Sequence, residues 1–293
     1  MNNYVILTDS GCDLPGDLAR ELGLEIVSIT HQLRGETHNG AWMSEADIKD
    51  FYAALRAGEM AVTAQANPDA FDQALRPLLE QGKSVIAITL SGAISGTVNS
   101  ARLAAEDLNG QYGQAKVAVI DSLCASLGQG MLVWLVAQEK ARGASFDEAV
   151  AYAEDAKLRI NHIFTVDDLG FLKRGGRVSG ASALLGSLLH IKPVMYVDNQ
   201  GRLLVRDKVP MRKRAIRELA QAMANRGIDA DSQTVFISHG DASEEADMVI
   251  AACRETFPNI KVVKWYVGPS IGAHSGPGTL ALFFLGRNRD DAK

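Results

Sequence analysis

One histidine stands in the middle of a segment rich in glycine and proline near the carboxyl end of the chain. Residues 267–278 read VGPSIGAHSGPG, so that His274 is surrounded by four glycines and two prolines. Glycine permits backbone conformations that other residues avoid, and proline fixes φ. Residues 267–278 therefore predict a rigid loop after the strand at residues 260–266, with His274 presented outward as part of a binding surface.

Hydroxyl and carboxyl side chains gather directly after several of the predicted strands. In open α/β sheets, ligands bind beyond the carboxyl ends of strands, where small hydroxyls and helix amino-terminal N–H groups meet. The set has few cations, so it predicts a site for a carboxylate or a single phosphoryl group. For Asp9, Ser10, Asp121 and Ser122 the plain alternative is that they only cap helices, since Ser and Asp are preferred there. The residues concerned are Thr8, Asp9, Ser10, Asp121, Ser122, Ser238, His239, Asp241 and residues 91–97 (SGAISGT).

The common cofactor and nucleophile motifs are missing or incomplete. The chain has no Walker A sequence and no complete dinucleotide-binding glycine pattern, so neither ATP hydrolysis nor nicotinamide binding is expected. Residues 268–272 match the G-x-S-x-G pattern around Ser270, but a nucleophile elbow needs a helix immediately after its serine. Because more glycine and proline follow, the sequence favours a chance match. No His or Cys pair has zinc spacing, and we expect no metal or other cofactor.

Apolar strand-like runs alternate with amphipathic helical runs, which indicates α/β architecture with mostly parallel sheets. The pattern restarts after about residue 157. We therefore expect two α/β lobes, residues 1–157 and 158–293, with a ligand cleft or tunnel between them. The expected strands are residues 4–8, 25–32, 85–90, 116–121, 163–166, 193–197, 203–206, 234–238 and 260–266. The expected helices are residues 44–56, 68–80, 101–107, 130–140, 145–157, 210–226 and 243–256.

Composition excludes several classes of protein. The net charge of −5 argues against a general nucleic-acid surface. The longest apolar runs, residues 131–137 and 280–285, are far too short to span a membrane, and the amino terminus lacks the features of a signal peptide. Three cysteines without metal-ligand spacing fit a reducing compartment. The sequence therefore predicts a cytoplasmic protein without an integral membrane segment.

The chain resembles the DegV family of bacterial fatty-acid-binding proteins over essentially its whole length, and seven segments carry the resemblance. They are TDSGCDLP (8–15), TAQANP (63–68), LSGAISGT (90–97), VIDS through GQG (119–130), DDLGFLKRGGR (167–177), IKP (191–193) and GAHSGPGT (272–279). The resemblance implies two α/β domains that enclose one long-chain fatty acid. It also implies a separate fatty-acid kinase, which phosphorylates the presented carboxylate with ATP, so that the acyl phosphate enters phospholipid synthesis.

The resemblance implies a carboxylate site formed by the Thr63 and Ser95 hydroxyls and His274, with the Gly96 N–H as a further donor. Each residue also has a plainer interpretation, because Thr63 or Ser95 can cap a helix and His274 can hold its own loop together. The family commonly has Ser and Pro where this chain has Ala64 and Ala66, which leaves the head-group preference open.

Two further groups of residues are candidates for the tail pocket and for docking. Residues 181–191 are apolar around most of a helical circumference and predict either acyl-tunnel lining or ordinary core, with Leu184, Leu185 and Leu188 as the candidates. Basic residues on this acidic chain predict kinase docking or phosphate contact, or else a solvated surface: Arg174, Arg177 and Arg212.

Two other functional classes remain open from the sequence. A serine hydrolase would use Ser95 or Ser270 with His274 as the base, but neither an orienting acid nor an oxyanion hole can be assigned. A lipid-responsive regulator would need a signalling partner that the sequence does not identify. A non-catalytic carrier of fatty acid is the main expectation.

Overall fold

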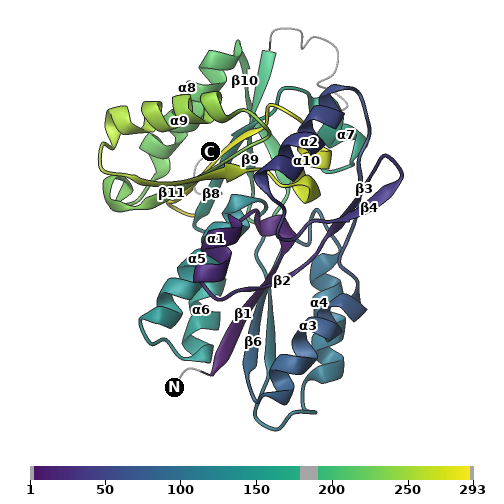
Figure 1. Ribbon diagram of the computed structural model, residues 1–293. Coiled ribbons are helices and arrows are strands. Elements are labelled where there is room, and N and C mark those ends of the chain that lie inside the picture. The colour runs from purple at the N-terminus through teal and green to yellow at the C-terminus, as the bar shows by residue number, and fades with distance from the viewer. Residues whose placement is uncertain (1–2, 179–190, 291–293) are drawn as a thin grey trace.

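The computed structural model describes residues 3–178 and 191–290 as two α/β lobes stacked end to end. In Figure 1 the four-stranded sheet lies at the bottom and the six-stranded sheet at the top. A small three-stranded sheet with α2, α7 and α10 lies beside the junction of the two lobes. The expected two-lobed α/β class is confirmed. The predicted boundary near residue 157 falls between α6 and β8 and remains a proposal.

The first lobe is built on a wholly parallel sheet of order β2-β1-β6-β7. Alternate side chains of each strand face opposite layers. On one face Leu7 and Ala87 pack against α3 and α4, and on the other Ile6 and Ile86 pack against α5. The strands are β1 (Tyr4–Asp9), β2 (Glu25–Val27), β6 (Ser84–Thr89) and β7 (Val117–Asp121). The helices are α1 (Gly16–Glu21), α3 (Pro68–Glu80), α4 (Thr97–Leu108), α5 (Leu127–Ala141) and α6 (Phe146–Ala156).

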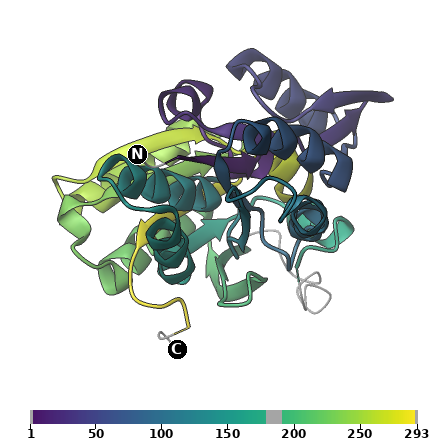
Figure 2. The same ribbon diagram turned by 90° about the horizontal axis from the view of Figure 1, so that it is seen from below.

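The single strand expected at residues 25–32 is wrong, because the chain changes sheet there. β2 ends at Val27, and β3 (Thr30–Leu33) begins a hairpin with β4 (Glu36–Asn39). The Ser10 hydroxyl accepts a hydrogen bond from the Ile29 N–H at 2.9 Å and so stabilises the crossing. β5 (Val62–Ala64) pairs with the other edge of β3, and α2 (Glu45–Arg56) lies between β4 and β5 in the chain. Figure 2 shows that the hairpin projects from the side away from the carboxyl-terminal segment.

The second lobe contains a six-stranded sheet of order β10-β9-β8-β13-β11-β12. The prediction of mostly parallel sheets is correct for the first lobe and wrong here, since only β11 and β12 pair in parallel. The physical reason is connectivity, because β9 and β10 form a hairpin and β13 inserts between β8 and β11. The strands are β8 (Ile160–Thr165), β9 (Ile191–Val197), β10 (Leu203–Pro210), β11 (Thr234–His239), β12 (Lys261–Tyr266) and β13 (Leu280–Leu285).

The two faces of this sheet have different neighbours. One face packs against α8 (Arg212–Arg226) and α9 (Ser243–Thr256) through residues such as Ile237 and Leu282. The other face turns toward the first lobe and carries Phe236 and Phe283. Helix α5 is buried around most of its circumference, as expected for a helix that contacts both sheets.

Residues 269–275 form a short helix, α10 (Pro269–Ser275), where the sequence predicted a loop. Proline is favoured at the first position of a helix, because its fixed φ suits the helix and its missing N–H would have no partner there. Gly268 is extended before it, and Gly276 ends it with a φ of 79°. The glycines and prolines therefore bound a helix, which packs against α7 (Leu169–Arg174).

Candidate functional site

A cavity of about 240 Å³ lies between the strand ends of the first lobe and the inner face of the six-stranded sheet. The sheet contributes a largely apolar wall. An apolar cavity of about 150 Å³ holds benzene, so this one has room for a longer apolar ligand. The apolar residues of the wall include Phe164, Val197, Leu203, Ala281 and Phe283.

The predicted carboxylate ligands meet on one side of this cavity. Thr63, Ser95, Gly96 and His274 all line it, although they come from β5, the loop before α4, and α10. The Thr63 hydroxyl lies 2.7 Å from His274 Nε2. We call these four residues the polar mouth. A carboxylate placed there would meet hydroxyls, an imidazole and the start of a helix, all of which favour an anion.

The loop that carries Ser95 is held by two carboxylates from neighbouring strand ends. Asp9 accepts hydrogen bonds from the N–H groups of Leu90 at 2.7 Å and Gly11 at 2.9 Å. Asp121 accepts from the N–H of Gly92 at 3.1 Å. Burial raises the pKa of the Asp9 carboxyl to about 6, against the effect of these hydrogen bonds. Asp9 caps the short helix at Ser10–Cys12, as the plainer interpretation has it, whereas Asp121 caps no helix among the described residues. Both carboxylates hold backbone and so position the loop that reaches the cavity.

Ser95 and Gly96 form the entry to α4. The Ser95 hydroxyl accepts from the Thr97 N–H at 3.3 Å and lies 2.9 Å from the Thr97 hydroxyl. Gly96 is the N-cap residue, and a Cβ on it would collide with the side-chain oxygen of Gln65. Ser95 therefore combines a capping contact with a place in the cavity wall.

His274 is a neutral imidazole at pH 7. Its pKa is lowered to about 4, first by burial and second by the neighbouring Arg177 guanidinium. The other ring nitrogen, Nδ1, faces Gly175, where any Cβ would collide with it. A close glycine on one side and Thr63 on the other fix the orientation of the ring.

Comparison with known proteins shows which family shares this sequence and architecture. The family model described as "Uncharacterised protein, DegV family" matches residues 3–287. A DegV domain-containing protein of Clostridium perfringens is 39% identical, over 99% of this chain and 100% of that protein. The chain belongs to the DegV family.

Two solved DegV structures share the fold over nearly the whole chain. A DegV family protein from Thermus thermophilus, whose structure is described as fatty acid binding, is 30% identical with a TM-score of 0.84, over 97% of this chain and 99% of that one. DegV of Bacillus subtilis, described as a fatty acid binding protein, is 27% identical with a TM-score of 0.83, over 98% and 100%.

The three candidate docking arginines lie in different surroundings. Arg174 is exposed and stacks over Phe171 at 4.6 Å, and it has no ion-pair partner among the described residues. Arg177 lines the cavity and donates to the Ile94 carbonyl at 3.2 Å. The docking role of each stays a prediction.

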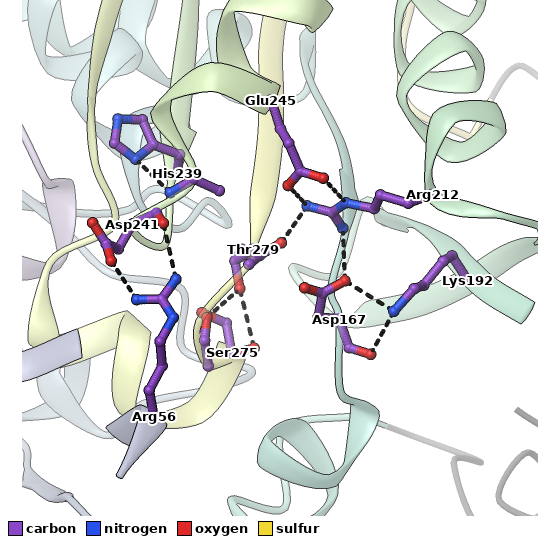
Figure 3. Close-up of polar contacts among 12 residues, drawn as sticks. Arg56, Asp167, Lys192, Arg212, His239, Asp241, Glu245, Ser275 and Thr279 are labelled. Atoms are coloured by element: carbon purple, nitrogen blue, oxygen red, sulfur yellow. Dashed lines mark hydrogen bonds and ion pairs between the residues drawn. The ribbon is translucent and has the colours of Figure 1, made fainter. Parts of the chain in front are cut away.

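Arg212 is set apart from the other two arginines by its partners (Figure 3). Its guanidinium contacts Glu245 at 2.9 Å, Asp167 at 3.6 Å and the Gly278 carbonyl. Its side chain is 14% exposed. These contacts join α8 to α9 and to the turn after α10, so a structural role accounts for Arg212, and docking by it stays a prediction.

Some predictions lie outside the described residues, and some cavity residues were missed. Leu184, Leu185 and Leu188 lie outside the described residues. His162 and Ser238 both line the cavity. The sequence assigned His162 to no site, and it placed Ser238 only among the strand-end side chains of a predicted anion site. The strand period of two carries the signal, since it puts His162 on the same face as Phe164 and Ser238 on the same face as Phe236.

Other kinds of site have little support within residues 3–178 and 191–290. No group of three His, Cys, Asp or Glu side chains there could hold a metal ion. No helix in that part of the chain is long and apolar enough to cross a membrane.

Proposed function

We propose that this protein binds a long-chain fatty acid in the cavity and presents its carboxylate to a partner fatty-acid kinase. The kinase would form the acyl phosphate that feeds phospholipid synthesis. The main support is the hydrogen-bonded pair formed by the Thr63 hydroxyl and His274 Nε2, which are 2.7 Å apart. The pair lies with Ser95 and Gly96 at one side of a largely apolar cavity. The fatty-acid-binding relatives from Thermus thermophilus and Bacillus subtilis support the proposal.

Burial of the acyl tail supplies most of the binding energy. A C16 acid has about 14 methylenes, and each is worth about 0.8 kcal/mol when buried, so the gross gain is about 11 kcal/mol. Association and ordering take back a large part. The carboxylate must also keep hydrogen bonds, because a charge buried without them is very costly. The polar mouth supplies such donors.

The arrangement favours a carrier over a hydrolase. The Nε2 atom of His274 is paired with Thr63, while the Ser270 hydroxyl lies 3.3 Å from the Ser10 hydroxyl. Among the described residues no carboxylate forms a hydrogen bond with His274, so the geometry lacks an orienting acid. A non-catalytic, cytoplasmic carrier also suits three free, buried cysteines.

The first experiment identifies the bound lipid. The purified protein is denatured, extracted with organic solvent and analysed by mass spectrometry. A near-stoichiometric long-chain fatty acid is expected. An empty extract, together with no uptake of added palmitate or oleate, would contradict fatty-acid binding.

The kinase part of the proposal is tested at Arg174, because its guanidinium is exposed and outside the cavity lining. We expect Arg174→Ala to keep fatty-acid affinity within about twofold and to slow phosphorylation by the cognate kinase about tenfold. Lys173→Ala, at the exposed neighbouring position, is the control. Equal phosphorylation rates for Arg174→Ala and the wild type would exclude Arg174 from docking.

A further inference from the structure

The cavity contains a second polar group, distinct from the polar mouth. Ser126 precedes α5 and Ser238 lies on β11, and both line the cavity. Their hydroxyls are 2.9 Å apart, and Ser126 donates to the Asp13 carboxylate at 2.5 Å. We call Ser126, Ser238 and Asp13 the inner polar chain. None of the three belongs to the polar mouth, and an unsubstituted alkyl tail would make no use of their hydrogen-bonding capacity.

The inner polar chain lowers the folding stability of the protein, because it buries a carboxyl and holds a serine in a rare backbone conformation. Asp13 is only 7% exposed, and burial raises the pKa of its carboxyl to about 8. Ser126 adopts φ 55° and ψ −145°, a conformation that non-glycine residues rarely accept. Strained backbone of this kind tends to persist at functional sites. The conformation places the Ser126 hydroxyl between Asp13 and Ser238.

The inner polar chain leaves the Ser238 hydroxyl with unused hydrogen-bonding capacity. Since Ser126 donates to Asp13, its oxygen is free to accept from Ser238. The Ser238 oxygen then keeps lone pairs that no described residue occupies. When the Asp13 carboxyl is protonated, the order of donors can reverse: Asp13 donates to Ser126, and Ser126 donates to Ser238. The Ser238 hydroxyl is then free to donate to a ligand. Ser238 can thus satisfy a ligand group that donates or accepts.

A third hydroxyl that lines the cavity, that of Ser275, has no hydrogen-bond partner among the described residues. Ser275 is only 5% exposed. The structure connects it to the region of Ser238. The Thr279 hydroxyl donates to the Ser275 carbonyl at 3.0 Å, as Figure 3 shows, and the Thr279 carbonyl accepts from Gly240, two residues after Ser238.

From these observations we infer that the cavity accepts fatty acids that carry a hydroxyl group on the acyl chain. The chain hydroxyl would hydrogen-bond to Ser238 and Ser275, while the carboxylate occupies the polar mouth. A buried hydroxyl without a partner destabilises a complex, so an unsubstituted tail leaves Ser275 unsatisfied and a hydroxylated tail satisfies it. The inference rests on the proposed fatty-acid binding and specifies its substrate class.

The test compares matched ligands on the full-length, delipidated protein. Displacement of a fluorescent fatty acid gives the affinity for stearate and for octadecanoic acids with one hydroxyl at different positions. At least one hydroxylated isomer is expected to bind about tenfold more tightly than stearate, the effect of one well-placed buried hydrogen bond. If stearate binds and no isomer binds more tightly than stearate, the inference is overturned and the proposed function stands. If neither class binds, the proposed function fails with it.

Variants assign the preference to residues. In Ser238→Ala and in Ser275→Ala, the preference for the best isomer should fall about tenfold while stearate affinity is kept. Two variants are used because Ser238 is fully buried on β11 and its loss can weaken folding, which thermal unfolding will show. Ser270→Ala is the control, because Ser270 lines the cavity but its hydroxyl is paired with Ser10. A preference that survives in both test variants would overturn the assignment.

Discussion

The two lobes contribute to the cavity in different ways. The first lobe presents the ends of its parallel strands and the starts of helices, which place Ser95, Gly96 and Ser126 at the cavity. The second lobe presents the face of its sheet, with Phe164, Leu203 and Phe283. Strand ends and helix starts leave backbone N–H and C=O groups without partners, whereas those groups within a sheet form hydrogen bonds to the neighbouring strands. The difference explains why one side of the cavity is polar and the other largely apolar.

The largest expected effect comes from changing a glycine that supports the polar mouth. Gly175 has φ −70°, which alanine accepts, but an added Cβ would collide with His274 Nδ1. We expect Gly175→Ala to displace the ring and to lower fatty-acid affinity by a factor between about 10 and 100, the value of a hydrogen bond to a charged group. Displacement titration with a fluorescent fatty acid measures it.

The control for this change is Gly96→Ala. Gly96 also has a permissive φ of −76°, but there the added Cβ meets the end of the flexible Gln65 side chain, which can move. The loss should stay within a few-fold. Equal losses for the two variants would show that the ring position of His274 does not control binding.

A smaller effect is expected on the apolar wall. Ala281 lines the cavity, so Ala281→Leu would occupy room equal to about three methylenes of the tail. Affinity should fall about tenfold for the longest bound acids and less for shorter ones, as measured across a chain-length series. Leu282→Met changes the opposite face of the same strand and should leave the series unchanged. An unaltered series in Ala281→Leu would mean that the tail lies elsewhere.

The last prediction concerns the pH dependence of folding stability, to which His274 contributes. In the folded protein burial lowers the pKa of His274 to about 4, from an ordinary value of 6.5. The unfolded chain therefore binds the proton first as pH falls, and stability decreases from about pH 6.5 toward pH 4. His31 and His239 shift in the same direction, so His274→Gln should remove only part of this loss. Urea unfolding at several pH values measures it, and an unchanged slope would contradict burial of His274.

Much of the local structure was predictable from short-range patterns. Residues 44–56 and 68–80 were expected as helices, and Ser44 and Asn67 cap them through hydrogen bonds encoded within three residues. Residues 267–278 were misjudged, because glycine and proline also bound short helices. The expected strand at residues 25–32 was misjudged for a different reason, since its break at Ile29 depends on a contact with Ser10.

The sequence by itself determined the α/β class, the family and the residue types of the polar mouth, because caps, strand alternation and motifs are local. Only the tertiary structure decided that Thr63 and His274, 211 positions apart, form a pair. It also decided the mostly antiparallel second sheet and the connection of Ser126 with Asp13 and Ser238. These features depend on how the lobes pack and which strands become neighbours, and such long-range contacts have no signature in any short segment.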